Sequence, residues 1–211
     1  MSTTTIDAVH VVDGDINAAI LESIRAAGRV AWDIETTGLD WAKDRIATVQ
    51  LAWSDSDPVL VRVQYDRVPD RLLDLLADGS VLKVLHHAMF DLRFMAHAWG
   101  AQICNVACTK IASKILAGGV PRNHSLAALI AEHFDVILEK DSRLTDWTAT
   151  TLTEAQVRYA ANDVKYLVPL LAQLTVELTS AGTRDLCEAC FAHLPTRVAL
   201  DLGGLGDVYE Y

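Results

Sequence analysis

The segment Trp32-Asp33-Ile34-Glu35-Thr36-Thr37-Gly38 closes an apolar run and ends in a turn-forming Thr-Gly pair, a pattern typical of a strand and the turn that stops it. Asp33 and Glu35 are two residues apart, so their side chains point to the same face of that strand. The flanking Ala31 and Ile34 predict that the strand is buried. Two carboxylates on a buried face repel each other unless a cation lies between them. A solvated strand edge remains the alternative, because an Asp-x-Glu pair alone is weak evidence.

The chain on either side of this strand predicts an α/β fold. Three strand candidates in succession indicate a meander, and a later strand follows through a parallel β-α-β connection. Asp15 is the expected N-cap of the first helix, and Thr153 with Gln156 makes a capping box at the start of the last one. Expected strands are residues 29–35, 45–53, 58–63 and 81–85, with a short alternating run at 7–12; expected helices are 15–27, 67–77, 90–99, 110–116, 125–134 and one long element at 154–180.

The bulk composition describes an ordinary globular protein. A length of 211 residues fits one domain, since domains run to roughly 50 to 250 residues. With 51% hydrophobic and 22% charged residues, neither disorder nor a fibrous repeat is indicated. No apolar run is long enough to cross a bilayer, and the first residues lack the pattern of a signal peptide. We therefore expect a single domain over residues 1–211, no membrane partner and a cytoplasmic location.

Four cysteines fall in two close pairs, Cys104 with Cys108 and Cys187 with Cys190. A reducing compartment makes disulfides improbable. A zinc site is one interpretation. Small buried thiols on helical faces are favoured over it, because the first pair is widely spaced and no further ligands flank either pair.

Two further segments place a carboxylate at the edge of a regular element. Asp91 lies in the first turn of a helix just after His86 and His87, where an acid can simply favour the helix dipole. Tyr159 and Asp163 are four residues apart and share one face of the long helix. By default such a tyrosine is a packed residue with its hydroxyl at the boundary. The two histidines are expected to be structural or to face a substrate, since a hard cation prefers oxygen ligands.

Together these segments resemble the three sequence blocks of the DEDD exonuclease superfamily, which is named for four acidic metal ligands. Asp33 and Glu35 match the first block, Asp91 the second and Asp163 the third, in the right order. The pattern Tyr-x-x-x-Asp that begins at Tyr159 resembles the tyrosine subclass. The histidine subclass would need a histidine five residues before the aspartate, where this chain has arginine.

The resemblance covers about residues 7–174, and its details are close to ribonuclease D. Thr145-Asp146-Trp147 and Tyr159-Ala160-Ala161-x-Asp163 carry that match. Two departures from that family stand out. Thr150-Thr151 occupy the positions where ribonuclease D usually has Arg-Pro, so one basic contact to substrate is lost. The accessory helical domains of that family are also not expected. Residues 33–40 and 86–92 also resemble the proofreading exonuclease domain of family A DNA polymerases. The ribonuclease D match is longer and more particular, so RNA is modestly favoured over DNA.

The resemblance implies a ribonuclease-H-like α/β fold, with a five-stranded mixed sheet and helices on both faces. It also implies a 3′-to-5′ exonuclease that hydrolyses phosphodiester bonds at the 3′ end of single-stranded RNA or DNA and releases nucleoside monophosphates. Two divalent cations, Mg²⁺ or Mn²⁺, are the implied cofactors. The implied metal ligands are Asp33, which bridges both cations, Glu35 and Asp163, which complete the water-activating site, and Asp91, beside the leaving 3′ oxygen. The other implied site residues are Tyr159, which orients the attacking water, and the substrate contacts Thr36, Thr37, Leu39 and His87.

The net charge of −10 at first speaks against a nucleic-acid partner. Two bound divalent cations would take −10 to −6 and would place positive charge where phosphate must lie. Two other classes of function remain open. A catalytically inactive nucleic-acid or protein adaptor should lack a ligand, yet the four acids and the tyrosine are all present. An endonuclease of the same architecture, such as a ribonuclease H, does not fit the tyrosine and the order of the acids.

Overall fold

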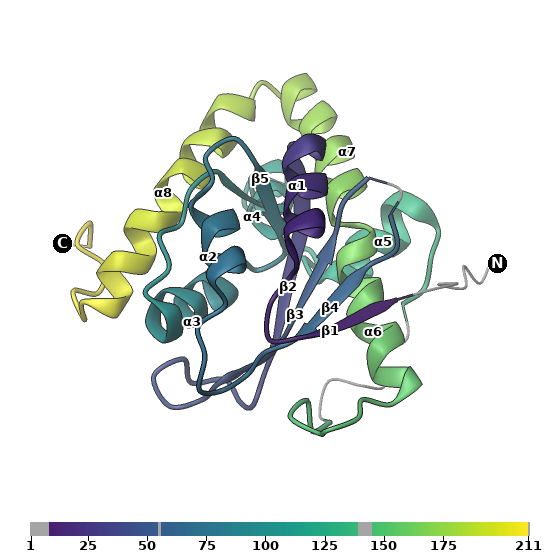
Figure 1. Cartoon of the computed structure of the whole chain (residues 1–211). Helices are drawn as coiled ribbons and strands as arrows, with labels where there is room; N and C mark the ends of the chain where they lie inside the picture. The colour runs from purple at the N-terminus through teal and green to yellow at the C-terminus, as the bar shows by residue number, and fades with distance from the viewer. Residues whose placement is uncertain (1–8, 55, 139–144, 211) are drawn as a thin grey trace.

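The computed structural model describes residues 9–54, 56–138 and 145–210, and it has a central sheet between layers of helices (Figure 1). The strands are β1 (His10–Asp13), β2 (Arg29–Thr36), β3 (Ile46–Ala52), β4 (Val59–Arg62), β5 (Leu82–Leu85) and β6 (Val106–Cys108). The helices are α1 (Ala18–Ala27), α2 (Asp70–Ala77), α3 (Met89–Trp99), α4 (Thr109–Ala117), α5 (Leu126–Phe134), α6 (Glu154–Lys165), α7 (Leu167–Ser180) and α8 (Arg184–Leu202).

The described strands form one mixed sheet in the order β1-β4-β3-β2-β5-β6. β2, β3 and β4 pair antiparallel, which confirms the expected meander, and β5 pairs parallel with β2. The α/β class is confirmed, but the expected number of five strands is wrong, because the sheet has six. The additional strand, β6, has only three residues, too few for a recognisable alternation in the sequence.

Helices cover both faces of the sheet, as expected (Figure 1). On one face α1, α2 and α3 pack against Trp32 and Ile34 of β2. On the other face α6 and α7 supply Val164 and Leu167, which pack against Ala31 of the same strand. β2 therefore lies between two helical layers, and its alternate side chains face different ones. In the described part of the chain, no helix has the length and apolar character needed to span a membrane.

The long helix expected at 154–180 is interrupted. α6 ends at Lys165 and α7 begins at Leu167, with Tyr166 between them. Pro169 explains the break, because proline has no N–H to donate and its ring clashes with the carbonyl four residues earlier, that of Lys165. The apolar stripe continues across the break, so both helices remain on the sheet.

One of the two expected helix caps is confirmed. Thr153 Oγ1 accepts from the backbone N–H of Gln156, and the side chain of Gln156 accepts from the backbone N–H of Thr153. The prediction that Asp15 caps α1 is wrong, since the side chain of Asn17 accepts the capping bond. Asp15 instead accepts from the backbone N–H of Arg71 at 2.8 Å, which connects the entrance of α1 to the first turn of α2.

α8 is the longest element that the sequence pattern does not predict. It has Pro195 in its interior and buries only Cys187, Leu194 and Val198, so its apolar residues make no continuous helical stripe. The four cysteines are free thiols, and Cys108 and Cys187 are buried as expected. Among residues 9–54, 56–138 and 145–210, no group of three possible metal ligands includes a cysteine. The described part of the chain therefore gives the zinc interpretation no support.

Candidate active site

Three carboxylates meet on the face of the sheet that α6 covers. Asp33 and Glu35 alternate with Ile34 on β2, and Ile34 points into the apolar core on the opposite face. Asp163 reaches the same place from α6. One ligand atom from each of these three acids lies within 4.8 Å of the other two, and all three side chains are half-buried. The structure thus brings three of the four expected acids into one compact group.

Local sequence explains how the two elements hold these acids together. Antiparallel pairing with β3 fixes the register of Asp33 and Glu35. Ala160 and Ala161 on α6 are 0% and 1% exposed, and their small side chains let the helix backbone lie close to the sheet. Asp163 follows them within one turn, so the close packing carries its carboxylate to the strand.

The fourth acid, Asp91, is held beside this group by a backbone contact. It lies in the first turn of α3, is only 3% exposed, and accepts a hydrogen bond from the N–H of Ile34 at 3.2 Å. Ile34 is the residue between Asp33 and Glu35. Burial raises the pKa of Asp91 to about 8. Asp91 is not one of the acids within the 4.8 Å group, but it lies close enough to Asp33 to act on that carboxyl's pKa.

The electrostatics of the group favour a bound cation. Burial raises the pKa of Asp33 well above its usual value, and the charges of Asp91, Asp163 and Glu35 raise that pKa further. Burial and mutual repulsion disfavour the charged forms of these carboxyl groups unless a nearby positive charge compensates them. All of the donors are carboxylate oxygens, the ligands that hard divalent cations such as Mg²⁺ and Mn²⁺ prefer. The residues present therefore fit the metal ions that the sequence implied.

Tyr159 lies one helical turn before Asp163, and both line a cavity of about 270 Å³ together with Asp33. The Tyr159 ring is 6.1 Å from that of Trp147, measured between centroids. This contact holds the phenol at the border between an apolar cluster and the acids. The other residues that line the cavity are His86, His87, Lys110, Ser125, Leu126, Ala127 and Leu138.

The two histidines have different surroundings. His87 is exposed at the cavity and has a φ of 62°, a left-handed conformation uncommon for any residue but glycine. His86 Nδ1 lies 2.8 Å from Thr109 Oγ1, and burial lowers the pKa of His86 to about 3. His86 is therefore neutral at physiological pH and well suited to a structural role. Lys110 brings a cation into the cavity, and the sequence pattern gave no signal for it, because it follows a strand too short to recognise.

The remaining expected substrate contacts lie at the end of β2 (Thr36) and on the turn after it (Thr37 and Leu39), and they do not line the 270 Å³ cavity. Thr36 Oγ1 donates to the carbonyl of Gly38 at 2.6 Å, and the N–H of Thr37 donates to the carbonyl of Arg45 at 2.9 Å. Leu39 is 85% exposed at the tip of this turn. Thr36 and Thr37 directly follow Glu35 in the chain.

A close approach requires glycine in this turn. A Cβ added to Gly38 would lie 2.4 Å from a carboxylate oxygen of Asp44. That same carboxylate accepts from the backbone N–H of Asp40 at 2.8 Å, which shapes the turn. Asp44 was not recognised as part of the motif from the sequence, since it acts only through the folded turn.

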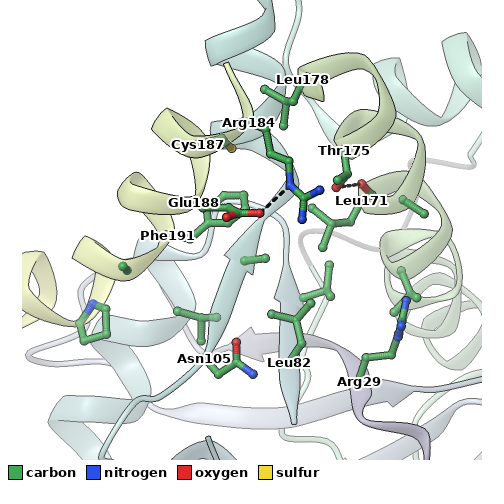
Figure 2. A pocket seen from close by; sticks show the side chains of 17 residues that line it. Arg29, Leu82, Asn105, Leu171, Thr175, Leu178, Arg184, Cys187, Glu188 and Phe191 are labelled. Carbon is green, nitrogen blue, oxygen red and sulfur yellow. Dashed lines mark hydrogen bonds and ion pairs between the residues drawn. The ribbon is translucent and has the colours of Figure 1, made fainter. Parts of the chain in front are cut away.

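A larger cavity, of about 680 Å³, lies between α7 and α8 over β5 and β6 (Figure 2). Its lining is mainly apolar, and Arg184 at its edge is paired with Glu188. Figure 2 shows Phe191 of α8 and Leu82 of β5 on its walls. None of the acids described above lines it, so its size does not make it the reaction site.

Comparison with known proteins agrees with this geometry. A family model described as 3′-5′ exonuclease matches residues 9–179, and the chain belongs to that family. Within it, the chain is a DEDD exonuclease that resembles ribonuclease D. It is 32% identical to ribonuclease D of Escherichia coli strain K12 over 174 residues, which are 80% of this chain and 44% of that protein. The chain spans less than half the length of the curated ribonuclease D relatives that it matches.

Solved structures give the same fold. Escherichia coli RNase D has 28% identity and a TM-score of 0.72, with 86% of this chain and 48% of that chain covered. Brucella melitensis NrnC with bound Mg²⁺ has 35% identity and a TM-score of 0.88, and NrnC bound to pGG has 36% and 0.88. Each NrnC comparison covers 96% of this chain and 98% of that one. The fold is therefore the ribonuclease-H-like fold of these exonucleases.

Proposed function

We propose that this protein is a 3′-to-5′ exonuclease that removes nucleoside monophosphates one at a time from the 3′ end of single-stranded nucleic acid, with RNA preferred. One observation carries the proposal. Asp33, Glu35 and Asp163, which are distant in sequence, present ligand atoms within 4.8 Å of one another beside a cavity, in a chain of the 3′-5′ exonuclease family.

Asp33, Glu35, Asp163 and Asp91 would hold two divalent cations, Mg²⁺ or Mn²⁺. The closeness of three carboxylates and the raised pKa of Asp33 support this assignment, as does the Mg²⁺ in the NrnC structure. Bound divalent cations supply an activated water and stabilise the charge on the phosphate and on the leaving oxygen. The bond from Asp91 to Ile34 would keep the fourth ligand in register with β2.

The other residues of the cavity would position the substrate. Tyr159 lines the cavity with Asp33 and Asp163, so its hydroxyl can orient the attacking water by a hydrogen bond. A phenol has a reference pKa of about 10, which makes it a poor general base at neutral pH. Lys110 and His87 line the same cavity and would contact the phosphate that is attacked. Lys110 extends the set of substrate contacts expected from the sequence.

The terminal nucleotide would lie against the turn after β2. Thr36 and Thr37 offer hydroxyl and backbone groups to its sugar, and the exposed Leu39 can pack on its base. The curated ribonuclease D relatives support RNA, and the solved relative bound to pGG supports a nucleotide ligand. A DNA exonuclease of the proofreading type is the second candidate.

We also propose that residues 1–211 act as one exonuclease domain, supported by the single sheet and by the packing of α8 on the core cluster. The cytoplasmic location expected from the sequence stays a prediction.

Two oligonucleotides that differ only in the final sugar test the substrate. The proposal expects a higher kcat/KM for the ribose end in Mg²⁺, with nucleoside monophosphate as the product. A clear preference for the deoxyribose end would favour the DNA candidate. Binding without hydrolysis of either strand in Mg²⁺ or Mn²⁺ would support the inactive adaptor instead.

A further inference from the structure

A second polar cavity, of about 400 Å³, lies on the same face of the sheet as the acids. Its floor includes Ala47 of β3 and Arg62 of β4, and Trp147 closes one side. The lining residues are Asp13, Arg45, Ile46, Ala47, Arg62, Val63, Gln64, Tyr65, Trp147, Thr148, Ala149 and Thr150. None of the four acids lines this cavity, and Thr150, which does line it, stands where ribonuclease D usually has an Arg-Pro pair.

Two structural connections join this cavity to the candidate active site. At one end, Arg45 exchanges two hydrogen bonds with Thr37: the Thr37 N–H donates to the Arg45 carbonyl at 2.9 Å, and the Arg45 N–H donates to Thr37 Oγ1 at 3.0 Å. Thr37 stands two residues after Glu35 in the chain. At the other end, the Trp147 ring of this cavity contacts the Tyr159 ring of the catalytic cavity. The two cavities are therefore neighbours on one surface.

Tyr65 and Arg45 give the second cavity the character of a stacking site. The Tyr65 side chain is 78% exposed, and the Arg45 guanidinium lies 4.6 Å from its ring centroid. A ring that is covered by a cation on one face and otherwise exposed can accept a flat base on the other face. Among the described residues, Tyr65 belongs to none of the apolar core clusters.

The arginines of this cavity differ in how they are paired. Arg62 forms a salt bridge with Asp13 and donates to the carbonyl of Thr150. Within the part of the chain that the structure describes, Arg45 has no salt-bridge partner. In a chain with a net charge of −10, a cation that lines a cavity and forms no salt bridge among the described residues is a suitable partner for phosphate.

We propose that this cavity binds the nucleotide strand on the 5′ side of the two terminal nucleotides, with a base stacked on Tyr65 and a phosphate bound by Arg45. Thr148 and Thr150 line the same cavity and would supply further polar contacts. The inference rests on the proposed function. It places in this cavity the part of the strand that the cavity near Asp163 does not hold. Stacking with backbone contacts reads no sequence, which suits an enzyme that trims any strand.

The test compares single-stranded oligoadenylates of two and five nucleotides in Mg²⁺, as the ratio of kcat/KM for the longer to that for the shorter. Tyr65→Ala is expected to lower this ratio about tenfold through KM, because stacking of one base contributes roughly 5- to 150-fold to binding. Tyr65→Phe should keep the ratio. Arg45→Ala should lower it as well and should reduce the single-strand log-log salt slope by about 0.7.

Tyr209→Ala and Arg184→Ala are the matched controls. Tyr209 is another exposed tyrosine, 66% exposed, and Arg184 lines the cavity between α7 and α8. Both controls should leave the ratio unchanged. An equal loss on both oligonucleotides, or no loss in Tyr65→Ala, would overturn the proposed strand site while hydrolysis itself continued to support the exonuclease.

Equilibrium binding of the five-nucleotide strand in the presence of chelator separates the two claims further. Tyr65→Ala should weaken this binding about tenfold whether or not the chain is active. If the wild-type chain hydrolyses neither oligonucleotide but Tyr65→Ala still binds the strand more weakly than wild type, the strand site would be supported and the exonuclease proposal overturned. Unchanged binding would overturn the strand site.

Discussion

The carboxylate of Asp91 accepts a hydrogen bond from the backbone N–H of Ile34 at 3.2 Å, across 57 residues of sequence. Because Ile34 separates Asp33 from Glu35, this bond fixes the first turn of α3 against the stretch of β2 that carries two of the acids. The four acids therefore come from three elements whose relative positions depend on backbone contacts as well as on core packing.

Removal of one carboxylate should abolish activity without unfolding the protein. Asp33→Asn and Asp163→Asn are each expected to lower kcat/KM at least about 10²-fold, since each removes a proposed metal ligand. In chelator, Asp33→Asn should melt at a higher temperature than wild type, because repulsion among the acids is relieved. Activity assays and thermal melts of the same preparations give both results. Normal turnover in Asp33→Asn would rule out the assignment.

Tyr159→Phe should separate positioning from metal binding. Loss of a single hydrogen bond to the attacking water is expected to reduce kcat by about 10²- to 10³-fold. The affinity for Mg²⁺, measured by calorimetric titration, should be unchanged, since the phenol is not a proposed ligand. If the phenylalanine variant were fully active, Tyr159 would be only a packing partner of Trp147.

The stability of the metal-free protein should fall as pH rises from about 4 to about 8. Burial raises the pKa of Asp91 to about 8, above a reference value of about 3.9, so the folded state binds more protons than the unfolded state in that window. The stabilising contribution is fully present below about pH 4 and is lost as pH rises through the folded pKa. Urea denaturation in chelator at several pH values measures the slope.

Asp91→Asn should flatten that slope, and excess Mg²⁺ should restore stability at pH 8, where the carboxylates are free to bind it. A wild-type slope of the opposite sign between pH 5 and pH 8, with no change in Asp91→Asn, would contradict the buried environment described for this acid.

A buried lysine away from the site predicts a second pH window. Lys83 is 0% exposed and donates from Nζ to the carbonyl of Asp78 at 2.7 Å. Burial lowers the pKa of Lys83 to about 8, below a reference value of about 10.4. The unfolded state then binds more protons between those values, so this lysine makes the protein more stable as pH rises from about 8 to about 10.

Lys83→Met should lack that increase. The difference in free energy of unfolding between wild type and the variant is therefore expected to move in favour of wild type from pH 7.5 to pH 10. Equal pH dependence of the two proteins in urea titrations would show that Lys83 ionises as it does in water.

The parts of the site that the sequence predicts correctly rest on short-range geometry. Asp33 and Glu35 share a face because strand side chains alternate, and Tyr159 lies near Asp163 because residues four apart on a helix are neighbours. The meander and the capping box at Thr153 are equally local. In each case the separation along the chain is small enough for a single element to fix the result.

The parts that the sequence did not predict depend on contacts between distant segments or on weak patterns. Lys110 joins the cavity only because β6, a three-residue strand, delivers it there. α8 lacks a continuous apolar stripe, and a proline in its interior, Pro195, is not typical of a helix, so the sequence pattern does not predict this element. The break at Tyr166 follows from Pro169 and was visible in principle, but the continuous stripe of leucines suggested one helix.

The polarity of degradation tests the central claim most directly. A single-stranded RNA labelled at its 5′ end, incubated with the protein and Mg²⁺, is predicted to give a ladder that shortens by one nucleotide per step from the 3′ end. Chelator or Asp33→Asn should abolish the ladder. Internal cleavage products without the ladder, shortening from the 5′ end, or an identical ladder from Asp33→Asn would contradict the account.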